Sequence, residues 1–347
     1  MSDSTALSEP GTSATPKPAG ARLSSDAIVT RILLGALILL ALVFALRSPA
    51  FFTARNLEVI LTNYAAVGLV AAIMALLVIA GSVDLSVGSN IGLSGMVTAL
   101  AATGGLAPEA SILAGVATGA GIGLVNGFFC ATLGFNPIIV TLGMMSLLRG
   151  ATLLLNPTEV YGLGDTFFWI GNGDFLGIPV LVWAVGLAFG LAALFTSTTV
   201  WGRYVYAIGL NRQAATLAAL PVRRVLLALH AAVGAAAGLA GVLLAARLDG
   251  ASPGSLGLTL EMQILTIVLL GGVAFAGGRG RVFGVFLAWL FLGVLGNGLT
   301  LLNVPPFVQL VASGLALVLA ASIDALGAWY QRRRAVRAAR GRSGTAA

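Results

Sequence analysis

Residues 201–224 read WGRYVYAIGLNRQAATLAALPVRR and form the one long basic insertion between apolar segments of this chain. Asn211 is a good helix-capping residue, so we predict a short helix over Arg212 to Leu220 that ends where Pro221 removes a backbone donor. Small side chains recur along it at helical spacing: Ala214, Ala215, Ala218 and Ala219. One face is therefore predicted to be small, flat and framed by arginines, which suits docking into a partner or lying on the cytoplasmic membrane surface.

The composition on either side of this insertion is that of a membrane protein. Of 347 residues, 58% are hydrophobic and only 9% are charged, whereas a soluble domain carries roughly 25% charged residues. The single Cys130 excludes a disulfide framework, and together with the single His230 it cannot build a zinc site. The net charge is +7, but the basic residues flank apolar spans, so we expect membrane lipid and no nucleic acid as a partner.

Apolar segments long enough for a bilayer, or nearly so, recur along the chain. They are Ile32–Leu46, Leu57–Ile79, Val87–Thr103, Ala110–Leu133, Pro137–Leu155, Leu176–Phe195, Val225–Ala246, Gln263–Phe275, Val282–Leu302 and Phe307–Leu326. The eighth is short enough to be irregular or partly re-entrant. The pattern predicts an all-α, polytopic membrane protein with about ten transmembrane helices. Residues 1–28 are predicted to be a disordered tail, 29–328 the membrane domain with the cytoplasmic segment 198–224, and 329–347 a basic tail.

The distribution of charge predicts the orientation of this domain. With ten spans and a cytoplasmic N-terminus, the inner side carries most of the cations: Lys17, Arg22, Arg31, Arg203, Arg212, Arg223, Arg224, Arg279, Arg281 and the arginines of the C-terminal tail. The outer side carries three cations and most acidic residues: Arg47, Arg55, Arg247, Glu58, Glu109, Glu159, Asp165, Asp174, Asp249 and Glu261. This agrees with the positive-inside rule, so both termini and residues 201–224 are predicted to be cytoplasmic.

Asp84 is a carboxylate among small residues, in the run AGSVDLSVGS at 80–89. An ionisable group at membrane depth costs several kcal/mol unless it is paired or solvated. Two roles stay open. Asp84 either caps the helix that follows, or it shapes, with Ser86, a polar gate or path for a hydroxyl-rich solute.

Two asparagine motifs and a threonine add further polar candidates. Asn126-Gly127 and Asn136-Pro137 are turn signals, and a helix is predicted to open at Pro137. Thr141 can project from that helix into a path between helices. Asn297, in the run GNG at 296–298, loosely echoes the first motif. The candidate residues of a translocation path or gate are thus Asp84, Ser86, Asn126, Pro137, Thr141 and Asn297.

Several kinds of chemistry are excluded by what the chain lacks. The glycine-rich stretch 269–284 contains no lysine, and Lys17 is the only lysine in the chain, so a Walker ATPase site is excluded. His230 lies among alanines and leucines and is predicted to be packed rather than a proton relay. Paired intramembrane carboxylates are absent, which disfavours a secondary transporter, and no serine has the acid and histidine partners of a hydrolase. We predict a transport protein that is not an enzyme and binds no metal or cofactor.

Five runs of residues carry a family resemblance. They are GSVDLSVGS at 81–89, LVNG at 124–127, NPIIVTLG at 136–143, YAIGLNRQAA at 206–215, and LGG followed by GGRG at 270–280. In order and approximate spacing, across about residues 50 to 326, they resemble the permease subunits of ribose-type ABC sugar importers. The sister permeases for branched-chain amino acids share the architecture but usually lack the Val-Asp-Leu-Ser type of run.

The resemblance implies a bacterial inner-membrane subunit that imports a monosaccharide: a pentose, hexose or deoxyhexose. It implies three partners: a second permease copy, identical or paralogous, a separate ATP-binding cassette subunit that holds the ATP, and a periplasmic sugar-binding protein. It also implies that the segment around Gly209 couples to the ATPase, and the expected coupling residues are Arg203, Gly209, Asn211, Ala214, Ala215 and Pro221. The alternatives are a stand-alone channel or facilitator for small polar solutes, and an ABC permease for another solute such as a branched-chain amino acid.

Overall fold

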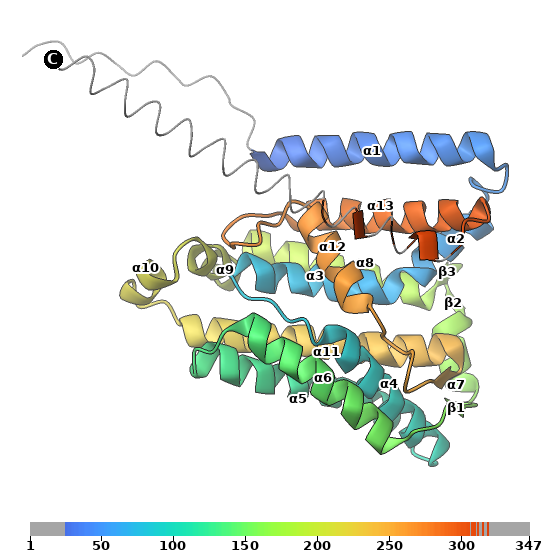
Figure 1. Ribbon diagram of the computed structural model, residues 1–347, viewed down its shortest axis with the longest axis horizontal. Helices are drawn as coiled ribbons and strands as arrows, with labels where there is room; N and C mark the ends of the chain where they lie inside the picture. The colour runs from blue at the N-terminus through green and yellow to red at the C-terminus, as the bar shows by residue number, and fades with distance from the viewer. Residues whose placement is uncertain (1–24, 306, 310, 312–313, 316–317, 319–347) are drawn as a thin grey trace, which may run out of the picture.

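The computed structural model describes residues 25–305, 307–309, 311, 314–315 and 318, and its regular structure is almost entirely helical (Figure 1). The helices are α1 (Ser25–Arg47), α2 (Ala54–Asn63), α3 (Ala65–Ile79), α4 (Val87–Thr103), α5 (Pro108–Gly127), the π-helical η1 (Phe128–Thr132), α6 (Pro137–Leu155), α7 (Asp165–Asn172), α8 (Val180–Thr198), α9 (Val200–Leu210), α10 (Arg212–Leu217), α11 (Val222–Leu248), α12 (Leu260–Leu270) and α13 (Val282–Leu301). Two short antiparallel pairs accompany them, β1 (Val160–Tyr161) with β4 (Gly250–Ala251), and β2 (Asp174–Phe175) with β3 (Ile178–Pro179). The all-α prediction is confirmed.

Several predicted spans differ in detail from the observed helices. The second is two helices, α2 and α3, which are bent by 52° at Tyr64. The fourth, predicted as Ala110–Leu133, is observed as Pro108–Thr132, and the turn indicated at Asn126-Gly127 does not form because α5 continues through Gly127 into η1. The first begins at Ser25, so residues 25–28 of the predicted tail are helical. The other tail residues and most of Phe307–Leu326 lie outside the described residues.

The helices differ in whether they are long enough to cross a bilayer. Six helices in the described part of the chain are long and apolar enough, or seven if the bent pair counts as one span. Helix α4 has 17 residues and α12 only 11, so the short eighth segment is confirmed as a short element. The structure thus supports a multi-span membrane protein and leaves the count of ten as a prediction.

The centre of the bundle is formed by α3 and α11. All residues of α3 but one are buried. Helix α11 packs closely against α5. Glycines of α5 face glycines of α11, and a Cβ atom added at Gly119 would collide with the backbone of Gly234 and Gly238. Such small-residue contacts let two helix backbones approach closely in lipid, where no hydrophobic effect drives the helices together. The glycine richness of these spans is therefore explained by this contact.

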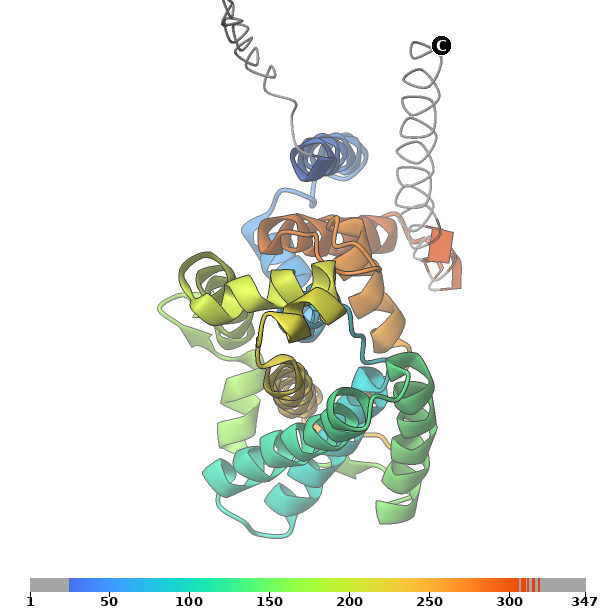
Figure 2. The same cartoon turned by 90° about the vertical axis from the view of Figure 1, so that its left-hand side faces the viewer.

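The long helices run roughly side by side, so the bundle has two ends (Figure 1). Helices α9 and α10 and the start of α11 lie at one end, which we call the basic end because it carries Arg203, Arg212, Arg223 and Arg224. Figure 2 views the molecule from this end. Helix α7 and the short strands lie at the opposite end. The insertion at 201–224 is therefore a single compact feature of one end of the bundle.

Candidate functional site

The insertion folds into the two short helices α9 and α10, with Asn211 between them. Asn211 is extended, and its side-chain oxygen accepts a hydrogen bond from the Ala214 N–H at 3.0 Å. This bond satisfies one of the free amides in the first turn of α10. The predicted helix start at Arg212 is thus confirmed, together with its cap.

The predicted end of this helix is wrong. Helix α10 stops at Leu217, and Ala219 adopts a left-handed conformation with φ of 57°. The Leu220 N–H then donates to the Ala215 carbonyl and the Ala219 N–H to the Thr216 carbonyl, both at 3.0 Å. This is the hydrogen-bond pattern of a Schellman motif. Pro221 directly precedes α11, so its role is to start the next helix rather than to end α10.

Ala219→Gly is expected to stabilise the end of α10 locally by about 1 kcal/mol, because the left-handed conformation strains a residue that carries a Cβ atom. Hydrogen exchange measured over residues 212–222 should slow by roughly fivefold. The matched control is Ala218→Gly, one residue earlier and at negative φ, which should speed the exchange. Equal effects of the two glycines would contradict the assignment.

The alanine face of α10 is divided between the core and the surface. Ala215 is only 5% exposed and packs into the core of the chain, whereas Ala214 and Ala218 are exposed. Leu217 is 89% exposed at the tip of the helix. The predicted single flat face is therefore wrong, and the free surface of α10 combines small side chains with one prominent leucine.

Basic side chains surround this surface. Arg212, Arg223 and Arg224 line a cavity of about 560 Å³ between α10 and the start of α11. Arg203 is exposed on α9. Such a set of guanidinium groups around an exposed apolar tip suits contact with an acidic protein surface.

Gly209 has a different role from the one expected of a docking residue. A Cβ atom added there would collide with the Ile79 carbonyl at the end of α3. That carbonyl accepts a hydrogen bond from the Gly278 N–H at 2.8 Å. The small size of Gly209 therefore lets α9 pack against α3 and the turn that precedes α13. Movement of α9 and α10 would reach the membrane-spanning helices through this contact.

A second candidate site is a polar cluster buried around Asp84, in the segment that links α3 to α4. Asp84 is 1% exposed. Its Oδ1 accepts from the Ser86 N–H at 2.9 Å and from the Ser86 hydroxyl at 2.6 Å, and its Oδ2 accepts from Asn126 Nδ2 at 2.9 Å. Asn126 Nδ2 also donates to Ser86 Oγ at 2.9 Å. Three of the predicted path residues are thus bonded to one another.

Two more elements join this cluster. His230 of α11 is fully buried, with Nε2 3.0 Å from Ser82 Oγ and Nδ1 3.8 Å from Asp84 Oδ2. Thr141 of α6 accepts a hydrogen bond from the Leu85 N–H at 3.1 Å and donates to the Pro137 carbonyl at 2.8 Å. The cluster therefore ties the α3–α4 link to α5, α6 and α11.

The geometry settles part of the question about Asp84. Ser86 occupies the cap position of α4 and makes no side-chain capping bond. Among backbone amides, Asp84 accepts only from that of Ser86, two residues on, so it fixes the turn before α4 rather than capping the first-turn amides of that helix. Its bonds to Asn126 and its contact with His230 are tertiary, and they satisfy a charge that is costly to bury alone.

Of the remaining two path candidates, one contributes only its backbone carbonyl to the cluster and the other lies elsewhere. Pro137 is the first residue of α6, and Asn136 caps that helix by accepting from the Ile138 N–H at 2.9 Å, which confirms the predicted helix start. Asn297 of α13 lies away from the cluster and donates to Asn56 Oδ1 of α2 at 3.0 Å. His230 was predicted to be a packed residue. Its contact with Asp84 has no signal in the local sequence, because the two residues are 146 positions apart.

Thr141→Val is expected to destabilise the folded protein by about 1–3 kcal/mol, because it leaves the Leu85 N–H without its acceptor in the interior. The measurement is thermal unfolding of the purified chain in detergent. Thr118→Val on α5 is a suitable control, since the Thr118 hydroxyl only donates to the Ala114 carbonyl of its own helix. Equal unfolding temperatures for the two variants would contradict a tertiary role for Thr141.

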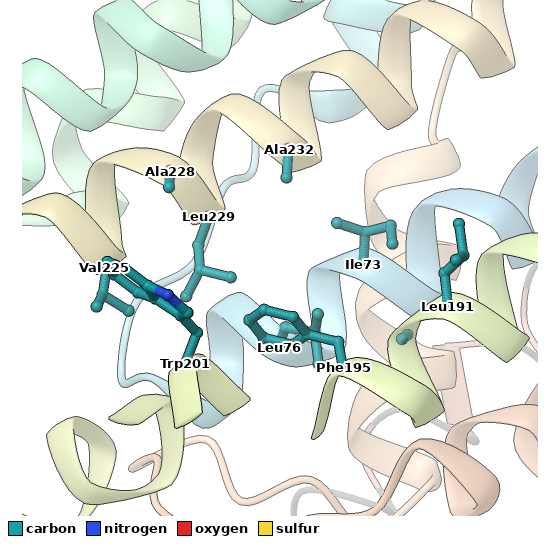
Figure 3. Close-up of a pocket in the computed structure, with 10 residues that line it drawn as sticks. Ile73, Leu76, Leu191, Phe195, Trp201, Val225, Ala228, Leu229 and Ala232 are labelled. Atoms are coloured by element: carbon teal, nitrogen blue, oxygen red, sulfur yellow. The ribbon is translucent and has the colours of Figure 1, made fainter. Parts of the chain in front are cut away.

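One further cavity lies between α3, α8, α9 and α11, with a volume of about 410 Å³. Figure 3 shows Trp201 of α9 and Phe195 of α8 pointing toward Val225 and Leu229 of α11 and Leu76 of α3 across this space. All its lining side chains are apolar or aromatic. The one polar side-chain group in this lining is the Trp201 indole N–H, which offers a hydroxyl-rich solute a single donor and no acceptor, so this cavity is a poor candidate for the transport path.

The chain is similar to known permeases over most of its length. Residues 56–321 match the family model described as branched-chain amino acid transport system / permease component. The ribose import permease protein of Escherichia coli K12 is 36% identical over 297 residues, which cover 84% of this chain and 92% of that protein. The L-arabinose ABC transporter permease protein of Azospirillum brasilense is 36% identical over 281 residues, 81% of this chain and 83% of that protein.

A third relative is the D-allose transport system permease protein of E. coli K12, which is 34% identical over 294 residues, 84% of this chain and 90% of that protein. No solved structure matches the chain. The family model covers well over half of the chain, and the relatives extend along nearly their whole lengths. The chain therefore belongs to the family of branched-chain amino acid transport system permease components, on the side of its sugar permeases.

Proposed function

We propose that this chain is the transmembrane permease subunit of an ATP-binding cassette importer that carries a monosaccharide across the bacterial inner membrane. The observation that carries the proposal is the similarity, over more than four fifths of the chain, to permeases named for ribose, L-arabinose and D-allose. All three sugars are aldoses rich in hydroxyl groups. The class of substrate proposed is therefore a pentose, hexose or deoxyhexose.

The proposed topology has ten spans and both termini in the cytoplasm. The basic end of the bundle is then the cytoplasmic end, as the positive-inside rule favours. The segment 198–224 faces the cytoplasm, and residues 329–347 form a basic cytoplasmic tail. The chain binds no cofactor of its own, and ATP is held by the partner subunit.

The proposed partners are an ATP-binding cassette subunit, a second permease copy and a periplasmic sugar-binding protein. The ATPase docks on the exposed surface of α10, where Ala214 allows close approach and Leu217 enters a groove of the partner. Arg203, Arg212, Arg223 and Arg224 face its acidic side chains. Asn211 and Ala215 hold α10 in place, and Gly209 transmits its movement to α3.

The proposed gate is the buried cluster of Asp84, Ser86, Asn126 and Thr141, with Pro137 as the carbonyl partner of Thr141. Because this cluster joins four elements through directed bonds, two arrangements of those bonds correspond to two arrangements of the helices. Energy from the ATPase acts by favouring one arrangement over the other. Asn297 forms a separate contact between α2 and α13, and the gate does not depend on it.

The test is uptake of radiolabelled pentoses, hexoses and deoxyhexoses into proteoliposomes that contain this chain, its ATPase and its binding protein. Uptake that needs both ATP and the binding protein is expected. Uptake down a gradient by this chain alone would instead identify a facilitator. Uptake of a branched-chain amino acid would assign the chain to the other branch of the family.

A further inference from the structure

Besides the segment that links α3 to α4, a second non-helical segment lies beside the start of α4. Residues 252–259, which lead from β4 to α12, are not part of any regular helix and run back into the bundle (Figure 1). Their backbone lies against one face of α4: Cβ atoms added at Gly88 and Gly92 would approach the carbonyls of Gly257 and Leu256 to 2.8 and 2.7 Å. Gly257 itself has φ of +75°, which favours glycine.

This contact lies halfway through the membrane domain. Asn90, between these two glycines, donates from Nδ2 to the Gly119 carbonyl at 3.2 Å. Gly119 is close to the middle of the 25-residue span Pro108–Thr132. Helices α4 and α12 therefore both begin near mid-depth. Irregular backbone at this depth is found where it is buried in protein or lines a polar cavity, and broken helices at mid-depth are where transporters bind solutes.

Two charged side chains meet on this glycine face of α4. Glu261, in the first turn of α12, is predicted from sequence to lie on the outer side, but its side chain is buried, with 9% exposed. Its Oε2 lies against Gly88, in the space that a Cβ atom at that residue would occupy. Arg149 of α6 donates from Nη1 to the Leu256 carbonyl at 3.1 Å and lies 3.6 Å from a Cβ atom added at Gly92. Gly88 and Gly92 are four residues apart, so the two charged groups lie on neighbouring turns of one helix face.

The two groups are near each other without being bonded. Among the described residues, the one acid–base contact within 4.0 Å is that of Asp84 with His230, so no Arg149 nitrogen lies within 4.0 Å of the Glu261 carboxylate. Glu261 Oε2 is buried and has no hydrogen-bond partner. By contrast, both carboxylate oxygens of Asp84 already accept hydrogen bonds. Among these two buried carboxylates, Glu261 alone offers a free acceptor.

We propose that Glu261 and Arg149 contact the hydroxyl groups of the sugar at mid-depth of the translocation path. A hydroxyl group both donates and accepts, a carboxylate only accepts, and a guanidinium only donates. Glu261 Oε2 accepts a hydrogen bond from one sugar hydroxyl, and the remaining N–H groups of Arg149 donate to a neighbouring one. The solute thereby joins two opposite charges that are otherwise incompletely satisfied. This assignment rests on the proposed function and adds two residues that discriminate among substrates.

The experiment compares two sugars in the complete reconstituted complex: the transported pentose and its deoxy analogue lacking one hydroxyl. The variants are E261Q, E261D and R149Q, and the control is E109Q, which removes an exposed carboxylate at the start of α5. Initial uptake and ATP hydrolysis are measured in the same vesicles, with saturating loaded binding protein. A site built to bond a hydroxyl loses its preference for it when the bond is weakened or removed. E261Q keeps a neutral amide oxygen but loses the charged acceptor and adds a donor, and R149Q removes the guanidinium donors.

For E261Q and R149Q we expect uptake of the pentose to fall at least tenfold while ATP hydrolysis stays within twofold of wild type. The ratio of pentose to deoxypentose uptake should fall toward one. E261D keeps the carboxylate, so the variant should fold. Its side chain is one methylene shorter, which moves the carboxylate away from the sugar hydroxyl, so the uptake ratio should still change at least threefold. E109Q should leave both rates and the ratio unchanged.

A ratio that is the same in wild type, E261Q and E261D overturns the assignment. So does a loss of uptake and ATP hydrolysis in equal proportion for both sugars, because that result describes a structural carboxylate. If the wild-type complex shows no ATP-dependent sugar uptake, the proposed function fails and the inference with it. If the wild-type complex takes up the sugar and the Glu261 variants have the same uptake ratio as wild type, the inference is wrong and the proposed function stands.

Discussion

Asp84→Ala is expected to lower the free energy of unfolding by about 3–5 kcal/mol, the usual cost of removing one partner from a buried charged network. Ser86 and Asn126 lose the acceptor for three hydrogen bonds, and His230 loses the carboxylate that faces it. All of these groups lie in the interior, where water does not replace the lost partner. The melting temperature of the purified chain should fall by on the order of 10 °C.

The control for this prediction is Asp174→Ala, since Asp174 is exposed in the short strand β2. Its melting temperature should match wild type. Asp84→Asn keeps the shape and one acceptor oxygen, so its loss should be smaller than that of the alanine variant. A double-mutant cycle with His230→Ala measures the coupling directly, and additive effects of the two changes would show that the two side chains do not interact.

Ala214→Trp is expected to reduce ATP-coupled uptake at least tenfold while the membrane domain stays folded. Ala214 is exposed on α10 and contributes nothing to the core, so an indole there obstructs only a docked partner. Tenfold corresponds to about 1.4 kcal/mol of coupling free energy, within the range of 1–3 kcal/mol typical between linked sites. The measurement is uptake and ATP hydrolysis in the same proteoliposomes, and normal coupled uptake would remove α10 from the ATPase interface.

Two variants separate docking from folding in this experiment. Ala110→Trp, at an exposed position in the first turn of α5, adds the same side chain at the opposite end of the bundle and should leave coupling intact. Gly209→Val should behave differently from Ala214→Trp, because its added atoms collide with the Ile79 carbonyl. We expect this variant to lose thermal stability as well as uptake.

The helices themselves were predictable from the sequence, and the physical reason is the solvent. In lipid, a segment must satisfy its backbone donors and acceptors internally, so an apolar run of sufficient length becomes a helix whatever its neighbours are. The bounds of Val87–Thr103 and Pro137–Leu155 were predicted without error. Local capping was equally accessible, since Asn136 and Asn211 bond amides two or three residues away. The family resemblance was carried by short runs whose order along the chain is also local information.

The sequence does not show which helix faces pack against one another, and this required the tertiary structure. Helical spacing shows that Ala214, Ala215 and Ala218 are close to one another, but it does not say which of them the rest of the chain covers. Two contacts join segments that are far apart in sequence. One is between His230 and Asp84, and the other places Arg149 and Glu261 against the glycines of α4. Packing decides such contacts through the close approach of particular backbones. The sequence by itself therefore determined most of the helices, the caps at Asn136 and Asn211, and the family. The tertiary structure decided which buried polar atoms are satisfied and which, such as Glu261 Oε2, are left without a partner.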